Sequence, residues 1–146
     1  MIALIQRVTQ ASVSVDDAVI GRIDAGLLAL VGVEPDDGEA QVQRMCERLL
    51  GYRVFADAQG RMNRSLTDIG GGLLLVSQFT LAADTRSGMR PGFSTAAAPA
   101  EAERWFDRLL SVCRSAHRSG VETGRFGAHM VIHLVNDGPV TFLLRA

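Results

Sequence analysis

The chain has 146 residues, of which 47% are hydrophobic and 21% charged. This length and composition predict one globular domain, residues 1–146, with a hydrophobic core of its own. All 15 basic residues are arginines, which excludes a P-loop lysine, a Schiff base and a PLP anchor. A net charge of −1 argues against extensive wrapping of nucleic acid, and the absence of a signal peptide or a long apolar run predicts a cytoplasmic protein without a membrane partner.

The first half of the chain predicts strands followed by a helix. Strands are expected at 2–8, 12–20 and 26–33, the second because its valines alternate. The segment 35–52 begins with acidic residues and then has helical apolar spacing, carried by Val42, Met45, Cys46, Leu49 and Leu50. A short strand is expected at 52–55.

The second half predicts a long strand at 70–84, an irregular stretch at 82–99 and a second helix. That helix starts at Pro99 and stops before Gly120. Closing strands are expected at 127–136 and 139–146. Two widely separated helices among many strands indicate mixed α/β layers in a single domain, not a regular βαβ alternation.

The cysteines and histidines predict no metal or redox site. Cys46 and Cys113 lack CxxC spacing and are expected to be buried structural thiols. On a strand, His129 and His133 would stand about 13 Å apart, too far to share one zinc ion. His117 is expected to be a cation at the helix C-terminus. No cofactor is predicted.

A polar run interrupts the apolar segment 70–84. On a strand, Ser77 and Phe79 would point one way and Gln78 and Thr80 the other. Buried polar groups need hydrogen-bond partners, so the run is either a satisfied edge-strand cluster or the lining of a pocket.

Two further segments can be interpreted as either structural or functional. Arg86 and Arg90 would suit phosphate contacts, although a solvated surface loop fits the same sequence. Phe126, between glycines, is either a stacking surface for a base or a core aromatic at a bend.

The Gly138-Pro139 pair interrupts the last strand-forming stretch. Neither residue favours a sheet, because proline lacks an N–H and glycine packs no side chain. The Asp-Gly dipeptide before the proline fits a hairpin turn. The alternative is a backbone feature that faces a ligand.

Taken together, several segments resemble the D-aminoacyl-tRNA deacylases over the whole chain. They are "IQRV" (5–8), "GLLALVGV" (26–33), "VSQFTLAADTRSGMRPGFS" (76–94), "VETGRFGAHM" (121–130) and "LVNDGPVTF" (134–142). The signatures Ser-Gln-Phe-Thr and Asn-x-Gly-Pro-Val-Thr are specific when they occur together, about 60 residues apart. Gly92 and His129 depart from the family pattern, outside both signatures.

The resemblance implies a homodimeric α/β fold with a barrel-like core and two main helices. Its active site would lie across the subunit interface and hydrolyse the ester between a D-amino acid and the 3′-terminal adenosine of tRNA. The residues Ser77, Gln78, Phe79 and Thr80 would form the catalytic segment. A cis Gly138-Pro139 bond would enter the partner's pocket to select handedness.

The same resemblance assigns supporting and binding residues. Arg7 would hold the Gly138-Pro139 loop, with Asn136, Val140 and Thr141 as further support. Phe126 and Met130 would receive the terminal adenosine.

For the chemistry, water attack on the ester carbonyl is favoured, with the oxyanion held by backbone N–H groups near Phe79 and Thr80. The ribose hydroxyl of the substrate would assist. The alternative is Thr80 as a covalent nucleophile, which needs an activating base. Other possible roles are the clearing of glycyl-tRNA and a non-catalytic module for RNA-end binding or dimerisation.

Overall fold

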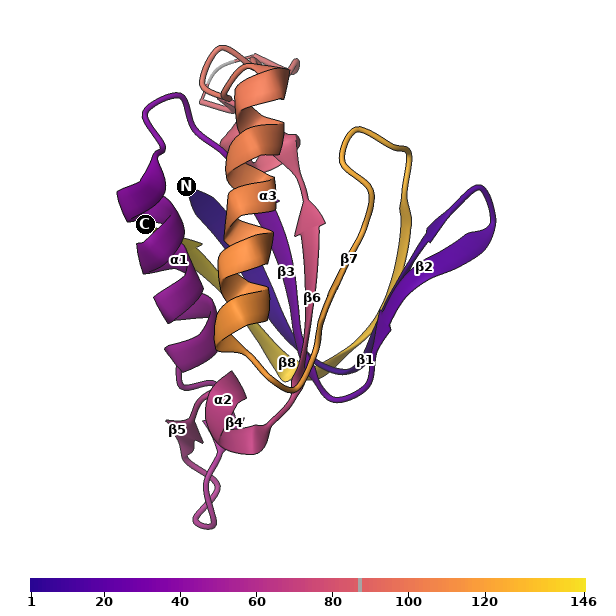
Figure 1. Ribbon diagram of the computed structural model, residues 1–146, viewed down its shortest axis with the longest axis vertical. Helices are drawn as coiled ribbons and strands as arrows, with labels where there is room; N and C mark the ends of the chain where they lie inside the picture. The colour runs from indigo at the N-terminus through magenta and orange to yellow at the C-terminus, as the bar shows by residue number, and fades with distance from the viewer. Residues whose placement is uncertain (87) are drawn as a thin grey trace.

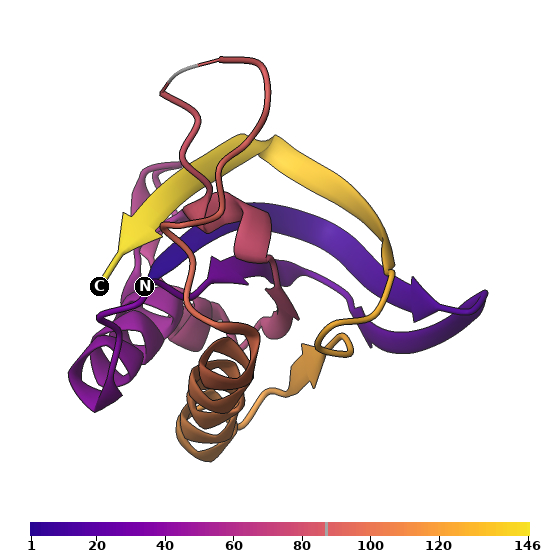
Figure 2. The ribbon, with the colours of Figure 1, turned by 90° about the horizontal axis from the view of Figure 1, so that it is seen from above.

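Strand β1 (Ile2–Val15) is the centre of the sheet in the computed structural model, which describes residues 1–86 and 88–146. Strand β8 (Val131–Arg145) runs antiparallel along one edge of β1. The other edge is shared by β3 (Gly26–Gly32) and β2 (Ala18–Ile23). Parallel strands β6 (Gly72–Ser77) and β7 (Val121–Thr123) extend the sheet beyond β3, in the order β2-β1-β3-β6-β7. The sheet curves strongly, as a barrel wall does (Figure 2).

The long helices α1 (Glu39–Gly51) and α3 (Pro99–Ala116) lie side by side on one face of the sheet (Figures 1 and 2). A small hairpin of β4 (Phe55–Ala56) and β5 (Met62–Arg64) follows α1, and a one-turn helix α2 (Leu66–Ile69) follows the hairpin. After β6 the chain enters a short 3₁₀ helix, η1 (Phe79–Ala82). The prediction of a mixed α/β domain with a barrel-like core and two main helices is confirmed.

Both faces of the central strands are buried. In β3 and β6, Leu27, Leu73 and Leu75 pack toward the helices, whereas Leu28 and Leu74 pack into a second cluster with Val13. A strand with two buried faces needs apolar residues at consecutive positions. The continuous runs "GLLALVGV" and "GGGLLLV" follow from this arrangement, and Cys46 and Cys113 are buried and free, as expected.

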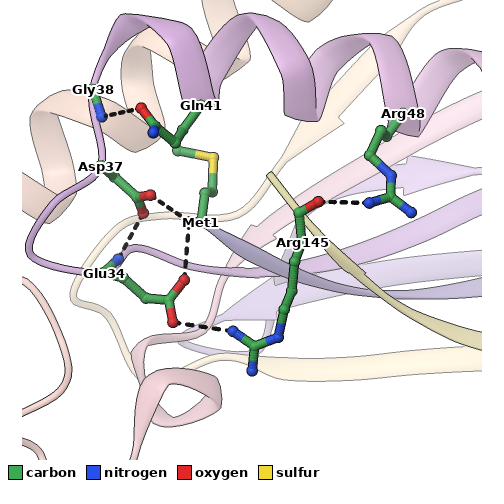
Figure 3. Close-up of polar contacts among 7 residues, drawn as sticks. All are labelled: Met1, Glu34, Asp37, Gly38, Gln41, Arg48 and Arg145. Carbon is green, nitrogen blue, oxygen red and sulfur yellow. Dashed lines mark hydrogen bonds and ion pairs between the residues drawn. The ribbon is translucent and has the colours of Figure 1, made fainter.

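A polar cluster ties the start of β1 to the end of β8 (Figure 3). The Met1 ammonium group is buried and pairs with Asp37 and with Glu34, the latter at 3.0 Å. Glu34 also pairs with Arg145 at 3.2 Å. Burial raises the pKa of Glu34, but the ammonium group and Arg145 outweigh it and leave this pKa below its ordinary value.

Three predicted strands have different limits in the structure. Strand β1 continues to Val15, and the turn lies at Asp16-Asp17, with φ of 50° and 62°, inside the strand predicted at 12–20. Aspartate tolerates this left-handed conformation better than most residues. The strand predicted at 52–55 begins only at Phe55. The short elements α2, β5 and β7 were not predicted, because two to four residues carry no periodic signal.

The long strand predicted at 70–84 is wrong beyond Ser77. The Gln78 N–H still donates to the Val31 carbonyl at 2.7 Å, but the chain then turns into η1. The expected alternation of residues 77–80 on two strand faces is therefore wrong. Of the irregular stretch predicted at 82–99, residue 87 lies outside the described residues.

The closing region is one strand instead of two. Strand β8 passes through Gly138-Pro139, and its register with β1 shifts twice near Val8. The strand starts at Val131, so the expectation that His129 belongs to it is wrong. His117 lies at the C-terminal end of α3, as expected, but it is buried, and its Nε2 donates to the Gly71 carbonyl at 2.7 Å.

Candidate functional site

A pocket of about 430 Å³ opens between η1, the start of α3 and the turn that leads from β7 to β8. We call it the η1 pocket. It brings together five of the predicted site residues: Ser77, Gln78, Phe79, Phe126 and Met130. Residues that were not predicted to belong to the site complete its wall: Val76, Ala97, Pro99, Ala102, Gly127, Ala128, His129 and Ile132. Most of these are small or apolar, and such residues carry no chemical signal in a sequence.

The η1 helix forms the polar edge of the pocket. Phe79 and Thr80 are the first two residues of the helix, and the first N–H groups of a helix have no acceptor within it. The Thr80 hydroxyl accepts a hydrogen bond from the Gln78 amide at 2.5 Å, and Thr80 itself does not line the pocket. The N-terminal end of η1 therefore meets the pocket at Phe79, while the Thr80 hydroxyl is engaged with a neighbouring side chain.

The opposite wall carries the aromatic and thioether side chains. Phe126 packs against Phe106 of α3, with ring centroids 6.2 Å apart. The turn after it depends on Gly127, whose φ of 72° favours glycine. Met130 lies against the second core cluster as well as the pocket. Phe126 is thus both a core aromatic and a pocket wall.

The histidines do not form a shared site. His129 lines the η1 pocket, whereas His133 lines a different depression together with Ser12 and Arg22. Within residues 1–86 and 88–146, no group of three or more His, Cys, Asp or Glu side chains could hold a metal ion. No helix in the same part of the chain is long and apolar enough to cross a membrane.

The second signature forms a separate cluster in the middle of β8. The Gly138-Pro139 bond is cis, as the resemblance implies. The Asn136 side chain spans the pair by donating to the Thr141 hydroxyl at 3.0 Å and accepting from the Val140 N–H at 3.2 Å.

Arg7 fixes this cluster to the rest of the chain. Its Nε donates to the Asp137 carbonyl at 3.2 Å and lies 3.0 Å from the Asp137 carboxylate, while Nη1 donates to the Val54 carbonyl at 2.7 Å. Gly138 and Pro139 are both exposed.

One chain does not bring the two signatures together. The first turn of α3, which contributes to the pocket, lies near the top of Figure 1, whereas β8 turns at the lower end of the sheet, and there Arg7 ties Asp137 to the Val54 carbonyl just before β4. No residue between 136 and 141 lines the pocket.

The two loop arginines differ in their availability. Arg86 forms a two-pronged ion pair with Asp84, at 2.9 and 2.7 Å, which holds the pKa of Asp84 well below its usual range. Arg90 is exposed. The pairing of Arg86 leaves Arg90 as the better placed of the two for a phosphate.

Comparison with known proteins identifies the family. The family profile described as D-Tyr-tRNA(Tyr) deacylase matches residues 4–145. The chain belongs to this family. D-aminoacyl-tRNA deacylases of Stenotrophomonas maltophilia and Xanthomonas axonopodis pv. citri are 74% and 73% identical to it over 145 residues, which is 99% of each chain.

Two solved structures share the fold of this chain. One described as a c-Myc DNA unwinding element binding protein has a TM-score of 0.95 and 36% identity, with 100% of this chain and 99% of the other covered. A probable eukaryotic D-amino acid tRNA deacylase has a TM-score of 0.89 over 99% and 98% of the two chains. At 17% identity, the second likeness concerns the fold alone.

Proposed function

We propose that the protein hydrolyses the ester bond between a D-amino acid and the 3′-terminal adenosine of tRNA. The observation that carries this proposal is the η1 pocket, where the N-terminal end of η1, at Phe79, meets an apolar wall that includes the Phe126 ring. The names of relatives that share about three quarters of its residues support the same reaction. Its place of action would be the cytoplasm, where aminoacyl-tRNA is used.

The terminal adenosine would occupy the apolar side of the pocket. A volume of about 430 Å³ falls within the range of small-ligand sites. Phe126 offers a ring face for stacking, and Met130 offers a polarisable thioether that adapts to a flat base. The ester carbonyl would then lie toward η1.

The reaction would use backbone electrostatics. The N–H groups of Phe79 and Thr80 have no acceptor within η1, so they can stabilise the oxyanion that forms when water attacks the carbonyl. The neighbouring ribose hydroxyl of the substrate would assist the attack. A Thr80 nucleophile is less well supported, because the hydrogen-bond partner of its hydroxyl is an amide, which cannot accept the proton.

A second copy of the chain would complete the site. Gly138 and Pro139 are exposed, and neither lines the η1 pocket of its own chain. The same strand exposes Val131, Val135 and Leu143, with 47% of Val135 and 52% of Leu143 accessible. Such a row of exposed apolar residues suits a two-fold interface between identical chains, in which each copy would present Gly138-Pro139 to the pocket of the other.

Selection of D-amino acids would depend on this loop. An enzyme that accepts many side chains has to discriminate at Cα, where closely placed backbone atoms exclude one enantiomer by clash or by lost hydrogen bonds. Gly138 and Pro139 would supply such atoms. Glycyl-tRNA, which lacks a side chain, would escape this exclusion and is a plausible second substrate. Arg90 would be better suited than Arg86 to contact phosphates near the 3′ end of the tRNA, because Arg86 is paired with Asp84.

The test is a paired assay with D-tyrosyl-tRNA and L-tyrosyl-tRNA, with free tyrosine followed over time. We expect release from the D-ester and no release from the L-ester above the spontaneous rate. Release from neither would leave only a binding role, and release from both would contradict the selection at Cα.

A further inference from the structure

We propose that Gly124 is a positioning residue that sets the depth of the η1 pocket through Met130. The inference rests on the proposed adenosine site and adds a residue outside both signatures. Gly124 does not line the pocket, and it directly follows β7.

The backbone at Gly124 is held firmly in place. The preceding residue, Thr123, pairs with Leu75 of β6, and its hydroxyl donates to the Leu75 carbonyl at 2.8 Å. Gly21 of β2 also approaches closely, since a Cβ there would stand 2.8 Å from the Thr123 carbonyl oxygen. Gly124 is thus anchored next to the strand that leads into Ser77, and it cannot move away from a neighbour that needs more room.

Met130 occupies the space in which a side chain at Gly124 would lie. A Cβ at Gly124 would lie under 3.0 Å from the Met130 Sδ, closer than real Cβ atoms approach other heavy atoms. Its other neighbours are Val13 and Val76, at ordinary contact distances of 3.5 and 3.6 Å. The φ of Gly124 lies outside the left-handed region, so the backbone accepts an alanine. Among the described residues, the thioether of Met130 is the one group that stands too close for this added carbon.

Met130 has one direction in which to move. On its inner side it packs against the second core cluster, which is closely packed and resists intrusion. On its outer side lies the η1 pocket. Because methionine has three rotatable bonds, an added methyl group at Gly124 would push the thioether into the pocket instead of unfolding the chain.

The consequence concerns nucleotide binding and not the ester chemistry. A displaced Met130 would shorten the space for the purine ring, while the N–H groups of η1 stay where they are. Gly124 would therefore favour the deep binding of a purine nucleoside, and a larger residue would weaken it.

The test is Gly124→Ala, assayed with D-tyrosyl-adenosine, with Gly51→Ala as the matched glycine control because nothing lies within 4 Å of its Cβ position. We expect KM to rise about tenfold, with kcat within about twofold of wild type. This pattern is expected because the lost contacts bind the nucleoside equally in the ground state and in the transition state. Gly51→Ala leaves both constants unchanged.

A double-mutant cycle separates a role through Met130 from a general loss of packing. In the Met130→Ala background, Gly124→Ala is expected to have no further effect on KM. An equal effect in both backgrounds, a fall in kcat alone, an unchanged KM, or a variant that fails to fold would each overturn the proposal.

A binding experiment tests the role of Gly124 independently of hydrolysis. Adenosine 5′-monophosphate is titrated into the protein, and the NMR signal of the Met130 methyl group is monitored. Gly124→Ala is expected to shift that resonance in the free protein and to weaken binding. Wild-type binding without hydrolysis would count against the proposed function and not against Gly124. An unshifted resonance would count against Gly124 whatever the activity.

Discussion

The Arg7 guanidinium holds Asp137, the residue that precedes Gly138-Pro139, and links it to the backbone of Val54. Arg7 contacts both the carbonyl and the carboxylate of Asp137, and only 15% of its side chain is exposed. A planar group with several fixed donors can bind these acceptors at once, whereas lysine is a single point charge.

We therefore expect Arg7→Lys to retain the fold but to lower kcat/KM for D-tyrosyl-tRNA by about tenfold to a hundredfold, because the loop is less well held. The measurement is steady-state deacylation together with the melting temperature. Arg44→Lys, in an exposed pair with Glu47, is the control and should have no effect. Full activity of Arg7→Lys would contradict a positioning role.

A site shared between subunits predicts complementation between two defective chains. Ala102→Leu would fill the pocket of its own chain, and Arg7→Ala would loosen the loop that the proposed dimer presents to the partner's pocket. In a mixed dimer, one of the two sites combines an intact pocket with an intact loop. Random mixing is expected to restore about a quarter of the wild-type activity. If each chain carries a whole site, mixing restores nothing.

The Thr80 side chain is expected to be dispensable for hydrolysis. The Thr80 hydroxyl is bound to the Gln78 amide at 2.5 Å. The proposed contribution of Thr80 to the site is its backbone N–H, which alanine retains. Thr80→Ala should keep kcat within about tenfold of wild type, whereas loss of a covalent nucleophile costs several orders of magnitude. Single-turnover deacylation measures the difference, and Thr67→Ala serves as a threonine control far from the pocket.

The buried ammonium group of Met1 makes Asp37 important for stability. The Asp37 side chain is 4% exposed and the ammonium group is fully buried, so Asp37→Asn leaves a buried positive charge with a weaker partner. We expect a loss of about 3 kcal/mol in the free energy of unfolding, measured by urea denaturation. Glu34→Gln, at a carboxylate that is 34% exposed, should cost about 1 kcal/mol or less. Equal effects of the two would contradict this ranking.

Acid should weaken the link between the two long helices. Hydrogen bonds from Arg108 and then Gln43 lower the pKa of Glu39 from 4.5 to about 2. A lowered folded-state pKa means that the stabilisation is complete above about pH 4.5 and is lost as the pH falls toward 2. Glu39→Gln should lower the melting temperature by at most about 3 °C at pH 6, because the pair is exposed. The difference should vanish near pH 2, and a difference that grows in acid would contradict the assignment.

The sequence by itself determined the long elements and the family. Helical spacing from Val42 to Leu50 and a proline start at Pro99 predicted both main helices, since such periodic signals extend over several turns. The two signatures identified the deacylase family, and the profile match confirms it. The polar run at Ser77 was singled out from the sequence, but its strand conformation was wrong beyond Ser77, because the end of the β3–β6 pairing at Gln78 is a long-range feature that local patterning does not show.

Only the tertiary structure decided which residues form one site. The pocket wall includes Ala97, Ala102 and Ala128, whose small side chains leave room for a ligand. A sequence does not show where the fold leaves such a cavity. The fold also decided that Gly138-Pro139 lies outside the pocket of its own chain, because the path of β8 along β1 is set by long-range pairing. Residue types specify which chemistry is possible, and the packing of distant strands specifies where those groups meet.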